Sequence, residues 1–500
     1  MFIHFLTGAL EVISIGNILL IIAGTALGIM FGAIPGLTPA MAIALCLPMT
    51  FNLEIVSSMC LLIGLYLGGV SGGLISAILL RIPGTAGSLA TTFDGHPMAT
   101  QGKAGKALAA GIIFSFLGGL FSIMILLLVA PQLAEVAVRI TPFDYFSIIL
   151  FSLTLVGGLA GKSLIKGLLS CLLGICFSFV GSAPIDGVIR YTMGIRNLNG
   201  GFVFLPVMIG LYAVSQILNS AEDAINADAP TKITSNVGKV AITWQEFKGQ
   251  IVNFLRSSVI GTIIGILPGI GGGTSNLIAY TAAKSSSKEP EKFGTGIIDG
   301  IVAPETANNA AIGGAMIPLL CLGIPGDVVT AILIGAFMIQ GITPGPMLFT
   351  TQPTLLYSIF TALIISNIAM IVLELLFLKG FIKVLNIPKH ILLPGILCVC
   401  AIGAIGANNR VFDIFVILLF GILAFLITKF EYPVPPLVMG FILGPMLETN
   451  LRRGLIFSKG SIVPFFTHPL SCIMIILSVL SIVFTVVASN KKVKRVQNGQ

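Results

Sequence analysis

Long stretches without a charged residue alternate with short polar intervals along this chain. The charge-free windows are residues 12–53, 55–80, 107–134, 145–161, 167–185, 197–221, 257–283, 306–326, 328–373, 391–409, 414–428, 432–447 and 460–490. A helix needs about 20 apolar residues to cross a bilayer core. Several windows are long enough for two passes, or for one pass and a re-entrant hairpin. The pattern predicts an all-α polytopic membrane protein with about 11 to 14 membrane segments.

The longest polar interval, residues 219–250, holds seven charged side chains and the single tryptophan, Trp244. At about 30 residues it is too short for a separate folded domain. We therefore expect a first membrane half at 1–220, a polar extramembrane connection at 221–250 and a second membrane half at 251–490. Residues 491–500 form a basic tail directly after the last apolar window, which favours the cytoplasmic side.

Composition narrows the function classes. The chain is 56% hydrophobic and 9% charged, whereas a soluble domain is about 25% charged. In a membrane protein, the net charge of +8 reports topology more often than nucleic-acid binding. No G-x-x-x-x-G-K-[ST] phosphate loop and no C-x-x-C pattern occur, so neither an ATP site nor a metal site is predicted.

A proline-glycine motif occurs twice in the apolar windows, once in each half of the chain. The sequence from Gly28 to Leu37 and the sequence from Gly261 to Ile270 both read G-x-x-x-G-x-[IL]-P-G-[IL]. A second pair, 82–84 and 324–326, reads Ile-Pro-Gly, and each copy follows a run of small residues. Helix breakers at matched positions of two membrane halves are typical of discontinuous helices around a transport site. The halves are therefore expected to be related, whether inverted or not.

A helix that restarts after such a break presents free N–H groups and a positive dipole end, which suits a carboxylate. Freed backbone groups in a membrane must face protein or a water-filled cavity. The alternative is a kink or a packing contact without a ligand. The predicted substrate-binding residues are Pro35, Gly36, Thr38, Pro39, Gly84, Thr85, Pro268, Gly269, Gly272, Gly273, Thr274, Ser275, Asn276 and Gly326.

Ionisable and amide side chains inside the apolar windows are candidates for cation coupling, because intramembrane carboxylates are costly and usually functional. Glu305, Asn308 and Asn309 would share one helix face, and Asp327 stands between two windows. Their oxygens suit a hard cation or a proton relay. The alternative for Glu305 is an interfacial helix start beside Pro304.

Two other functions compete with a carrier. An intramembrane hydrolase would need a carboxylate pair such as Asp299 and Asp327, but matched halves are not required for one catalytic centre. A channel would use the same helices for downhill flux only. Asp94, in Asp94-Gly95-His96-Pro97, is expected in a polar turn. No catalytic residue is predicted.

These motifs resemble the large membrane subunit of tripartite tricarboxylate transporters, the TctA family. The resemblance is carried by the sequence from Tyr66 to Leu108 and by Ala303-Pro-Glu-Thr-Ala-Asn-Asn-Ala-Ala311, Gly323-Ile-Pro-Gly326 and Gly341-Ile-Thr-Pro-Gly-Pro346. It implies a secondary active transporter of the bacterial inner membrane, with no cofactor, that imports a small carboxylate on a sodium or proton gradient. It also implies two partners, a small four-helix membrane subunit and a periplasmic solute-binding protein. A carrier without partners is the nearest alternative.

The chain departs from the pattern expected of that family near the predicted site. The departures are Arg81, Ala86, His96, Thr100 and Asp327. Arg81 either pairs with a carboxylate of the substrate or extends to the membrane interface. These differences leave the transported carboxylate open, with a citrate-like tricarboxylate as one candidate.

Overall fold

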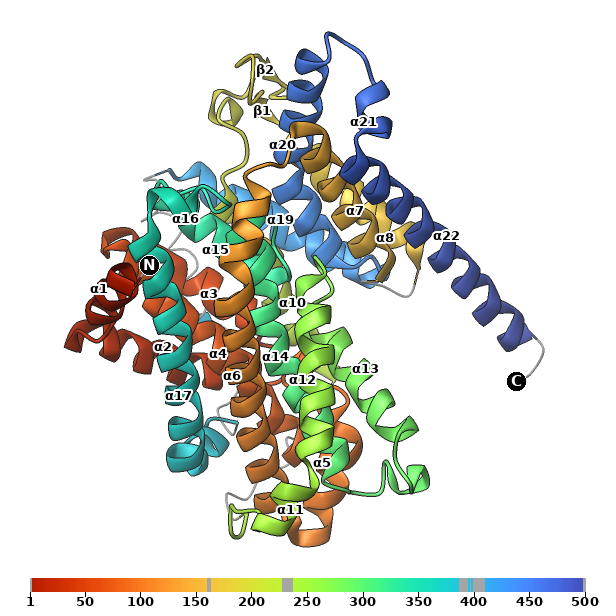
Figure 1. Ribbon diagram of the computed structural model, residues 1–500. Helices are drawn as coiled ribbons and strands as arrows, with labels where there is room; N and C mark the ends of the chain where they lie inside the picture. The colour runs from red at the N-terminus through yellow and green to blue at the C-terminus, as the bar shows by residue number, and fades with distance from the viewer. Residues whose placement is uncertain are drawn as a thin grey trace. The chain divides into compact units, whose positions relative to one another are not determined.

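The computed structural model describes residues 2–159, 163–226, 237–385, 394–395, 397–398 and 410–497. These residues are almost entirely helical (Figure 1) and fall into two compact units. Unit 1 comprises the described parts of Met1–Ala134, Gln216–Leu267 and Gly271–Asn409, and unit 2 those of Glu135–Ser215, Pro268–Ile270 and Arg410–Gln500. Each unit draws on both halves of the sequence, and the division at 221–250 stays a prediction.

Unit 1 is built from two groups of helices. The first group is α1 (Phe2–Val12), α2 (Ile15–Ala33), α3 (Pro39–Cys46), η1 (Leu47–Asn52), α4 (Ile55–Leu80), η2 (Ala86–Ser88), α5 (Thr91–Met98), η3 (Ala99–Lys103) and α6 (Ala104–Ala137). The second is α10 (Ser215–Asn226), α11 (Trp244–Gly249), α12 (Ile251–Ile266), α13 (Gly271–Ser285), η6 (Pro290–Lys292), α14 (Asp299–Leu322), α15 (Val328–Ile339), α16 (Leu348–Thr351) and α17 (Pro353–Val384).

The expected all-α membrane class is confirmed. In the described ranges, six helical segments are long and apolar enough to cross a bilayer: Ile15–Ala33, Ile55–Leu80, Thr91–Ala137, Pro353–Val384, Phe412–Lys429 and Pro469–Val487. Shorter apolar helices of 10–17 residues occur between them, including those at 251–266 and 328–339. Short helices of this kind are expected where membrane helices are interrupted.

Small residues bring α2 and α4 into close contact. A Cβ atom added to Gly28 would lie 2.5 Å from the carbonyl oxygen of Leu65, and one on Gly68 would lie 2.2 Å from that of Thr25. Lipid supplies no hydrophobic force between helices, so close backbone packing is the main source of their association. The glycines in both helices are therefore needed for this pair to form.

The second half repeats this pairing with α12 and α14. A Cβ atom on Gly261 would lie 2.3 Å from the carbonyl oxygen of Ala307, and one on Gly265 would lie 2.4 Å from that of Ala311. Helix α6 adds to the same core, because a Cβ atom on Gly118 would lie 2.4 Å from the carbonyl oxygen of Thr306. In Figure 1, α6, α12 and α14 are drawn as neighbouring rods of unit 1.

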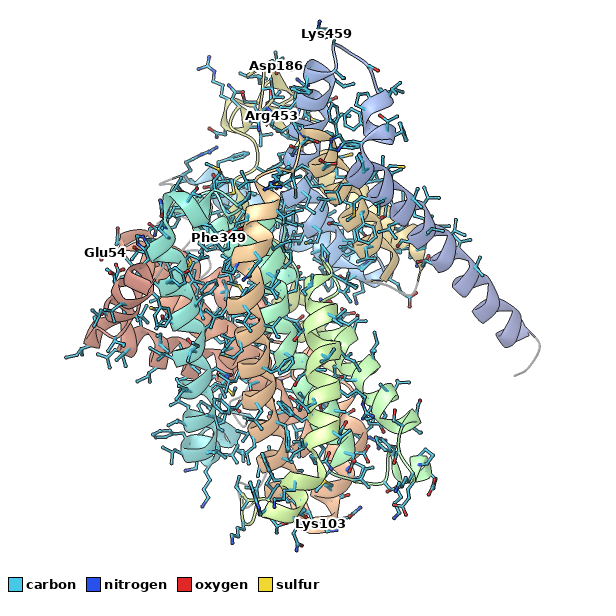
Figure 2. All side chains as sticks on the ribbon, in the orientation of Figure 1. Glu54, Lys103, Asp186, Phe349, Arg453 and Lys459 are labelled. Carbon is cyan, nitrogen blue, oxygen red and sulfur yellow. The ribbon has the colours of Figure 1, made fainter. Side chains whose placement is uncertain are left out.

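Unit 2 consists of α7 (Pro142–Leu159), α8 (Leu164–Ser178), β1 (Gly181–Ser182), β2 (Ile189–Arg190), η4 (Arg196–Leu198), α9 (Phe204–Met208), η5 (Ile209–Val214), α19 (Phe412–Lys429), α20 (Val434–Phe457), α21 (Val463–Thr467) and α22 (Pro469–Gln497). The two strands are antiparallel, with Gly181 opposite Arg190. Arg190 Nη1 donates to Glu448 Oε1 at 2.7 Å, and Nη2 donates to Oε2. Asp186 and Arg453 lie at this end of the unit (Figure 2).

Candidate functional site

The first proline-glycine motif interrupts a membrane helix, as predicted. Helix α2 ends at Ala33, Gly36 takes a left-handed conformation with φ 96°, and α3 begins at Pro39. The hydroxyl oxygen of Thr38 accepts a hydrogen bond from the backbone N–H of Met41 at 3.1 Å. Thr38 therefore caps the restarted helix. Because Pro39 has no N–H and the N–H groups of Met41 and Ala42 bond to Thr38, Ala40 supplies the free backbone N–H of this first turn.

The second motif produces a matching break between α12 and α13. Helix α12 ends at Ile266, Gly269 has a φ of 75°, and α13 begins at Gly271. Pro268 and Gly269 group with unit 2, whereas the helices on either side belong to unit 1. Gly272, Gly273 and Thr274 form the first turn of α13 and are half-buried. This turn presents free backbone N–H groups to partly accessible space.

The two Ile-Pro-Gly segments have the same capping geometry at matched positions of the two halves. Ser88 Oγ accepts from the N–H of Thr85 at 3.3 Å and donates to its carbonyl at 3.0 Å. Thr330 Oγ1 makes the same two bonds with Asp327, at 2.8 and 2.9 Å. The preceding helices, α4 and α14, also end alike, because Arg81 and Gly323 both adopt left-handed φ values, 59° and 70°. These two segments therefore resemble each other in local structure as well as in sequence.

The restarted helix of the second half binds the loop of the first half. Asn276 Oδ1 accepts from the backbone N–H of Ala90 at 2.8 Å, and Asn276 Nδ2 donates to the carbonyl of Gly87. Both bonds are fully buried. A Cβ atom on Gly273 would lie 3.2 Å from the Cβ of Ala86. The sequence predicted Asn276 as a donor to substrate, but its amide group is already used to join α13 to η2.

Asn308 lies where η2, α13 and α4 meet. This contact between the two halves of the chain is called the crossing. A Cβ atom on Gly87 would lie 2.0 Å from Asn308 Oδ1, and one on Gly272 would lie 2.3 Å from the same oxygen. Asn308 Nδ2 lies 3.4 Å from the carbonyl oxygen of Val70 in α4. One buried amide therefore contacts η2, α13 and α4, and both glycines are required beside it.

A second crossing joins α4 of the first half to the Ile-Pro-Gly segment of the second half, and it is made by Tyr66 and Asp327. The Tyr66 hydroxyl in α4 donates to Asp327 Oδ2 at 2.5 Å, while Asp327 Oδ1 accepts from the N–H and hydroxyl of Thr330, both at 2.7 Å. Asp327 caps α15 with both of its oxygens occupied. Tyr66 corresponds to Asn308 when the two Ile-Pro-Gly segments are aligned, so equivalent positions of the two halves supply the two cross-contacts.

Several predicted substrate residues within unit 1 pack closely against neighbouring helices. Gly84 lies against the carbonyl of Gly32 at the end of α2, and Pro39 lies against Gly69. Gly271 lies against Asp327, and Gly326 against Ala315. Ser275 is buried and donates to the carbonyls of Gly272 and Ala307 at 2.9 and 3.2 Å. Its hydroxyl serves packing in this structure, whereas Thr38 and Thr274 are half-buried.

Glu305 is fully buried in α14 and is not at a helix start. Its Oε1 accepts from the Thr91 hydroxyl at 2.5 Å, and its Oε2 accepts from the Ser115 hydroxyl at 3.3 Å. Asn309 Nδ2 donates to the carbonyl of Glu305 at 3.1 Å. Glu305 and Asn309 are thus adjacent along one helix, while Asn308 and Asp327 belong to the crossing described above.

A second buried carboxylate, Glu374 in α17, was missed by sequence reasoning. Its Oε2 accepts from the Ser71 hydroxyl at 2.9 Å, and its Oε1 has no hydrogen-bond partner among the residues that the structure describes. The sequence carried a signal, because Glu374 interrupts an apolar run that continues on both sides. The charge-free window 328–373 ends at this residue, although the helix continues through it to Val384.

Two other carboxylates have structural partners. Asp94 lies in helix α5, so the expected polar turn is wrong, and its oxygens accept from the N–H groups of Gly294, Gly296 and Ile297 at 2.9–3.1 Å. Asp299 begins α14 and binds Gln250 Nε2 at 2.9 Å. Gly326 packs against Ala315, so the chain turns back after α14 and Asp327 lies beside the middle of that helix. The 16 residues from Asp299 to Ala315 correspond to about 24 Å at about 1.5 Å per residue. The hydrolytic pair is excluded.

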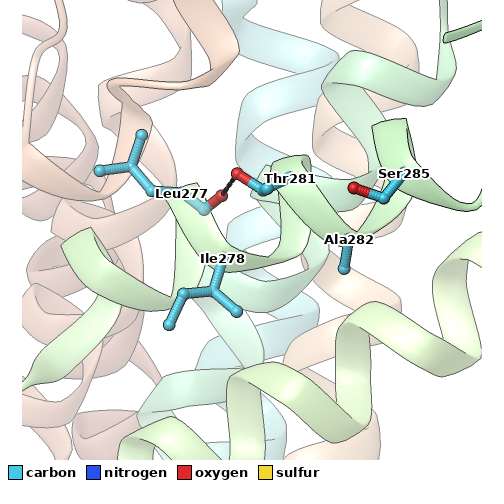
Figure 3. A pocket seen from close by; sticks show the side chains of 5 residues that line it. All are labelled: Leu277, Ile278, Thr281, Ala282 and Ser285. Carbon is cyan, nitrogen blue, oxygen red and sulfur yellow. Dashed lines mark hydrogen bonds between the residues drawn. The ribbon is translucent and has the colours of Figure 1, made fainter.

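An apolar hollow lies on the exposed side of α13 (Figure 3). It is lined by Leu277, Ile278, Thr281, Ala282 and Ser285. The Thr281 hydroxyl donates to the carbonyl of Leu277 at 2.9 Å, so it presents no free donor. None of the predicted substrate residues lines this hollow, and its character fits a surface that faces lipid.

Comparison with known proteins agrees with the fold and the repeated motifs. The sequence model of the tripartite tricarboxylate transporter TctA family matches residues 18–439. A 52.8 kDa protein of the TAR-I ttuC' 3' region of Agrobacterium vitis is 36% identical over 473 residues, covering 95% of this chain and 94% of that protein. A protein of the TAR-II ttuC' 3' region of the same organism is 39% identical over 229 residues, 46% of this chain and 95% of its own. No solved structure matches the chain significantly.

Proposed function

Because the chain belongs to the tripartite tricarboxylate transporter TctA family, we propose that it is the large permease subunit of a binding-protein-dependent secondary transporter. It imports a small carboxylate, of which a tricarboxylate is one candidate, on a sodium or proton gradient. It works in the bacterial inner membrane, with its basic C-terminal tail in the cytoplasm. A small four-helix membrane subunit and a periplasmic solute-binding protein complete the system.

The observation that carries this proposal is the double crossing between the halves. The restarted helix α13 joins the Ile-Pro-Gly segment of the first half through Asn276, and α4 joins that of the second half through Tyr66 and Asp327. Interrupted helices that meet in this way place helix termini and polar side chains inside the membrane. A single kink would not require matched contacts at equivalent positions.

The crossing offers donors of the kind that a carboxylate needs. The first turn of α13, at Gly272–Thr274, is half-buried and carries backbone N–H groups with no partner inside the helix. Glycines there let a ligand approach the backbone closely, and the positive end of the 15-residue helix favours an anion. The Thr274 hydroxyl adds a donor in the same turn. The Thr38 end of α3 supplies the matched group in the first half.

Alternating access would then consist of a movement of these crossed elements around the bound anion. The close backbone contacts of α2 with α4, and of α12 with α14, make each pair a unit that moves as one body. The cross-contacts of Tyr66, Asn276 and Asn308 are the bonds that such a movement would rearrange. The delivering protein sets which carboxylate arrives.

The test is transport by the reconstituted system. A candidate periplasmic binding protein from the same organism is screened by calorimetry against mono-, di- and tricarboxylates, and the bound acid is then used for uptake into proteoliposomes. We expect accumulation against a concentration gradient that requires the binding protein, the small subunit and an imposed sodium or proton gradient. Uptake by the chain alone would favour a stand-alone carrier. Downhill flux that ignores ion gradients would favour a channel.

A further inference from the structure

Four helices of unit 1 surround an apolar cluster and carry polar residues one turn away from it. The cluster includes Leu74 of α4, Leu108 and Ile112 of α6, Ile301 of α14 and Leu378 of α17. Residues three or four positions apart share one face of a helix. By that spacing, Ser71, Ser115, Glu305 and Glu374 each lie one turn from a member of the cluster.

Direct contacts join these four polar residues in two pairs. Ser71 donates to Glu374 at 2.9 Å, which links α4 to α17, and Ser115 donates to Glu305 at 3.3 Å, which links α6 to α14. Gly111 of α6 lies between Glu305 and Leu74, which is one turn after Ser71. A Cβ atom there would lie 3.5 Å from Leu74 of α4 and 3.7 Å from Cγ of Glu305. Both carboxylates are 0% exposed.

The site lacks positive charge. Within the described part of the chain, Glu374 Oε1 is buried without a hydrogen-bond partner, and so is Asn309 Oδ1 one turn beyond Glu305. The Asn309 Nδ2 group faces the carbonyl of Glu305, which fixes the amide orientation and leaves its oxygen as an acceptor. No lysine, arginine or histidine among the described residues forms an ion pair with either carboxylate. Two unneutralised carboxylates in a membrane interior would be very costly.

We propose that Glu305 and Glu374 form a carboxylate pair that holds one cation, Na⁺ or a proton, between α14 and α17. Ser71, Ser115 and Thr91 orient the carboxylate oxygens through their hydroxyl groups. A small positive charge satisfies the unpaired Glu374 oxygen and neutralises the pair, and oxygen ligands are those that hard cations prefer. This inference rests on the proposed transport function and assigns its coupling site.

The assignment differs from the site predicted by sequence. Asp327 and Asn308 are not part of it, since Asp327 has both oxygens bound by Tyr66 and Thr330 and Asn308 packs against two glycines. Glu374 replaces them. The pair and the crossing share α14, because Asn308 lies one helical turn after Glu305. Binding of the cation can therefore shift the same helix that contacts η2 and α13.

The first experiment measures cation binding without any substrate. The full-length chain is purified in detergent, and its thermal unfolding is followed in rising NaCl against choline chloride, and across neutral to mildly acidic pH. A bound cation raises the unfolding temperature in a saturable way. We expect Glu374→Gln and Glu305→Gln to lose this response. Ser71→Ala, which keeps both carboxylates, should raise the half-saturating cation concentration about tenfold.

Glu54→Gln is the matched control, because Glu54 is an exposed carboxylate at the start of α4 (Figure 2). It should respond as the wild type does. If Na⁺ raises the unfolding temperature and the effect depends on Glu305 and Glu374, the bound cation is sodium. If the unfolding temperature responds to pH alone through these residues, the bound cation is the proton. If the glutamine variants do not fold, the half-saturating cation concentration of Ser71→Ala tests the proposal in their place. Unchanged cation responses in Ser71→Ala, or in folded glutamine variants, overturn the proposal.

Uptake into proteoliposomes separates this inference from the proposed function. We expect the glutamine variants to lose gradient-driven accumulation while they keep exchange of carboxylate across the membrane, as measured by counterflow. If the wild type transports and the variants keep full ion coupling, the cation site is wrong and the transport function stands. If the wild type transports no carboxylate but its Na⁺ or pH response depends on Glu374, the transport function is wrong and the cation site stands.

Discussion

The Tyr66 hydroxyl donates to Oδ2 of Asp327 at 2.5 Å and so ties α4 of the first half to the cap of α15 in the second. Tyr66 is 1% exposed. The remaining Asp327 oxygen is held by Thr330. This arrangement gives the departure from the family pattern at position 327 a structural role, because the carboxylate is both helix cap and cross-link.

Replacing Tyr66 with Phe should weaken that cross-link while keeping the ring. A buried acceptor on a charged group then loses its donor, and we expect a loss of about 1–3 kcal/mol in stability. Thermal unfolding of the purified chain measures this. Tyr357→Phe, in α17, serves as the aromatic control and should have a smaller effect. An unfolding temperature equal to that of the wild type would contradict the stabilising role of the bond.

Gly87→Ala should be severely destabilising because the new methyl group would lie 2.0 Å from Asn308 Oδ1. Removing that amide with Asn308→Ala should recover part of the loss, so that the double variant is more stable than the sum of the two single effects predicts. Thermal unfolding of the four proteins gives the coupling energy. Gly380→Ala, in α17 with open space around it, should be close to neutral. Additive effects would show that Gly87 and Asn308 do not meet.

The ion pair between Lys106 and Glu246, 2.5 Å apart, should make the attachment of α11 pH-dependent. The hydrogen bond from Lys106 lowers the pKa of Glu246 from 4.5 to about 2. The stabilisation is therefore complete above the unfolded value near 4.5 and is lost as pH falls toward 2. Both side chains are partly exposed, so we expect less than about 1 kcal/mol.

Hydrogen exchange at Trp244–Gly249 tests this prediction. The wild type should be better protected than Glu246→Gln at neutral pH, and the difference should shrink as the medium is acidified below the unfolded pKa of the carboxyl group. Lys248→Met, which changes a neighbouring charge without touching this bond, is the control. A difference that grows on acidification would have the wrong sign and would exclude the ion pair as its cause.

Arg190→Lys should loosen the strand pair of unit 2. The arginine binds both oxygens of Glu448, and a lysine cannot reproduce this forked geometry. We expect a local loss of about 1–2 kcal/mol, visible as faster hydrogen exchange at residues 181–190. Arg453→Lys, an exposed arginine of α20, should leave exchange unchanged. Equal protection from exchange in the two variants would contradict a stabilising role for the two hydrogen bonds from Arg190 to Glu448.

The helix breaks could be predicted from sequence because proline and glycine act through local backbone geometry. The motifs at Pro35-Gly36 and Pro268-Gly269 interrupt helices where expected, and the Ile-Pro-Gly copies end α4 and α14. For some of the predicted substrate-binding residues, the structure instead shows a packing role. Ser275 and Asn276 bond to protein groups, so they contribute to the framework around the crossing.

Cross-contacts between the halves could not be predicted, since one sequence does not show which distant residues meet. Asn276 with Ala90 and Tyr66 with Asp327 are separated by 186 and 261 residues. Asp94 was misjudged for a related reason. Its Gly-His-Pro context favours a turn locally, but three backbone N–H groups from the distant loop 294–297 stabilise it within a helix. Glu374 looked like a boundary because charge alone does not distinguish a helix end from a buried site.

The anchoring of loop 294–297 by Asp94 makes the two halves unequal. The stretch from the proline-glycine motif to the Ile-Pro-Gly segment is longer in the second half, from Gly269 to Gly326, than in the first, from Gly36 to Gly84. Helix α13 and this loop lie within the longer stretch. If the two halves exchanged conformations symmetrically during the proposed transport cycle, loop 294–297 would have to leave Asp94. In the proposed transport cycle the two access states would therefore make different contacts even without a ligand, because the second half alone carries this anchored loop.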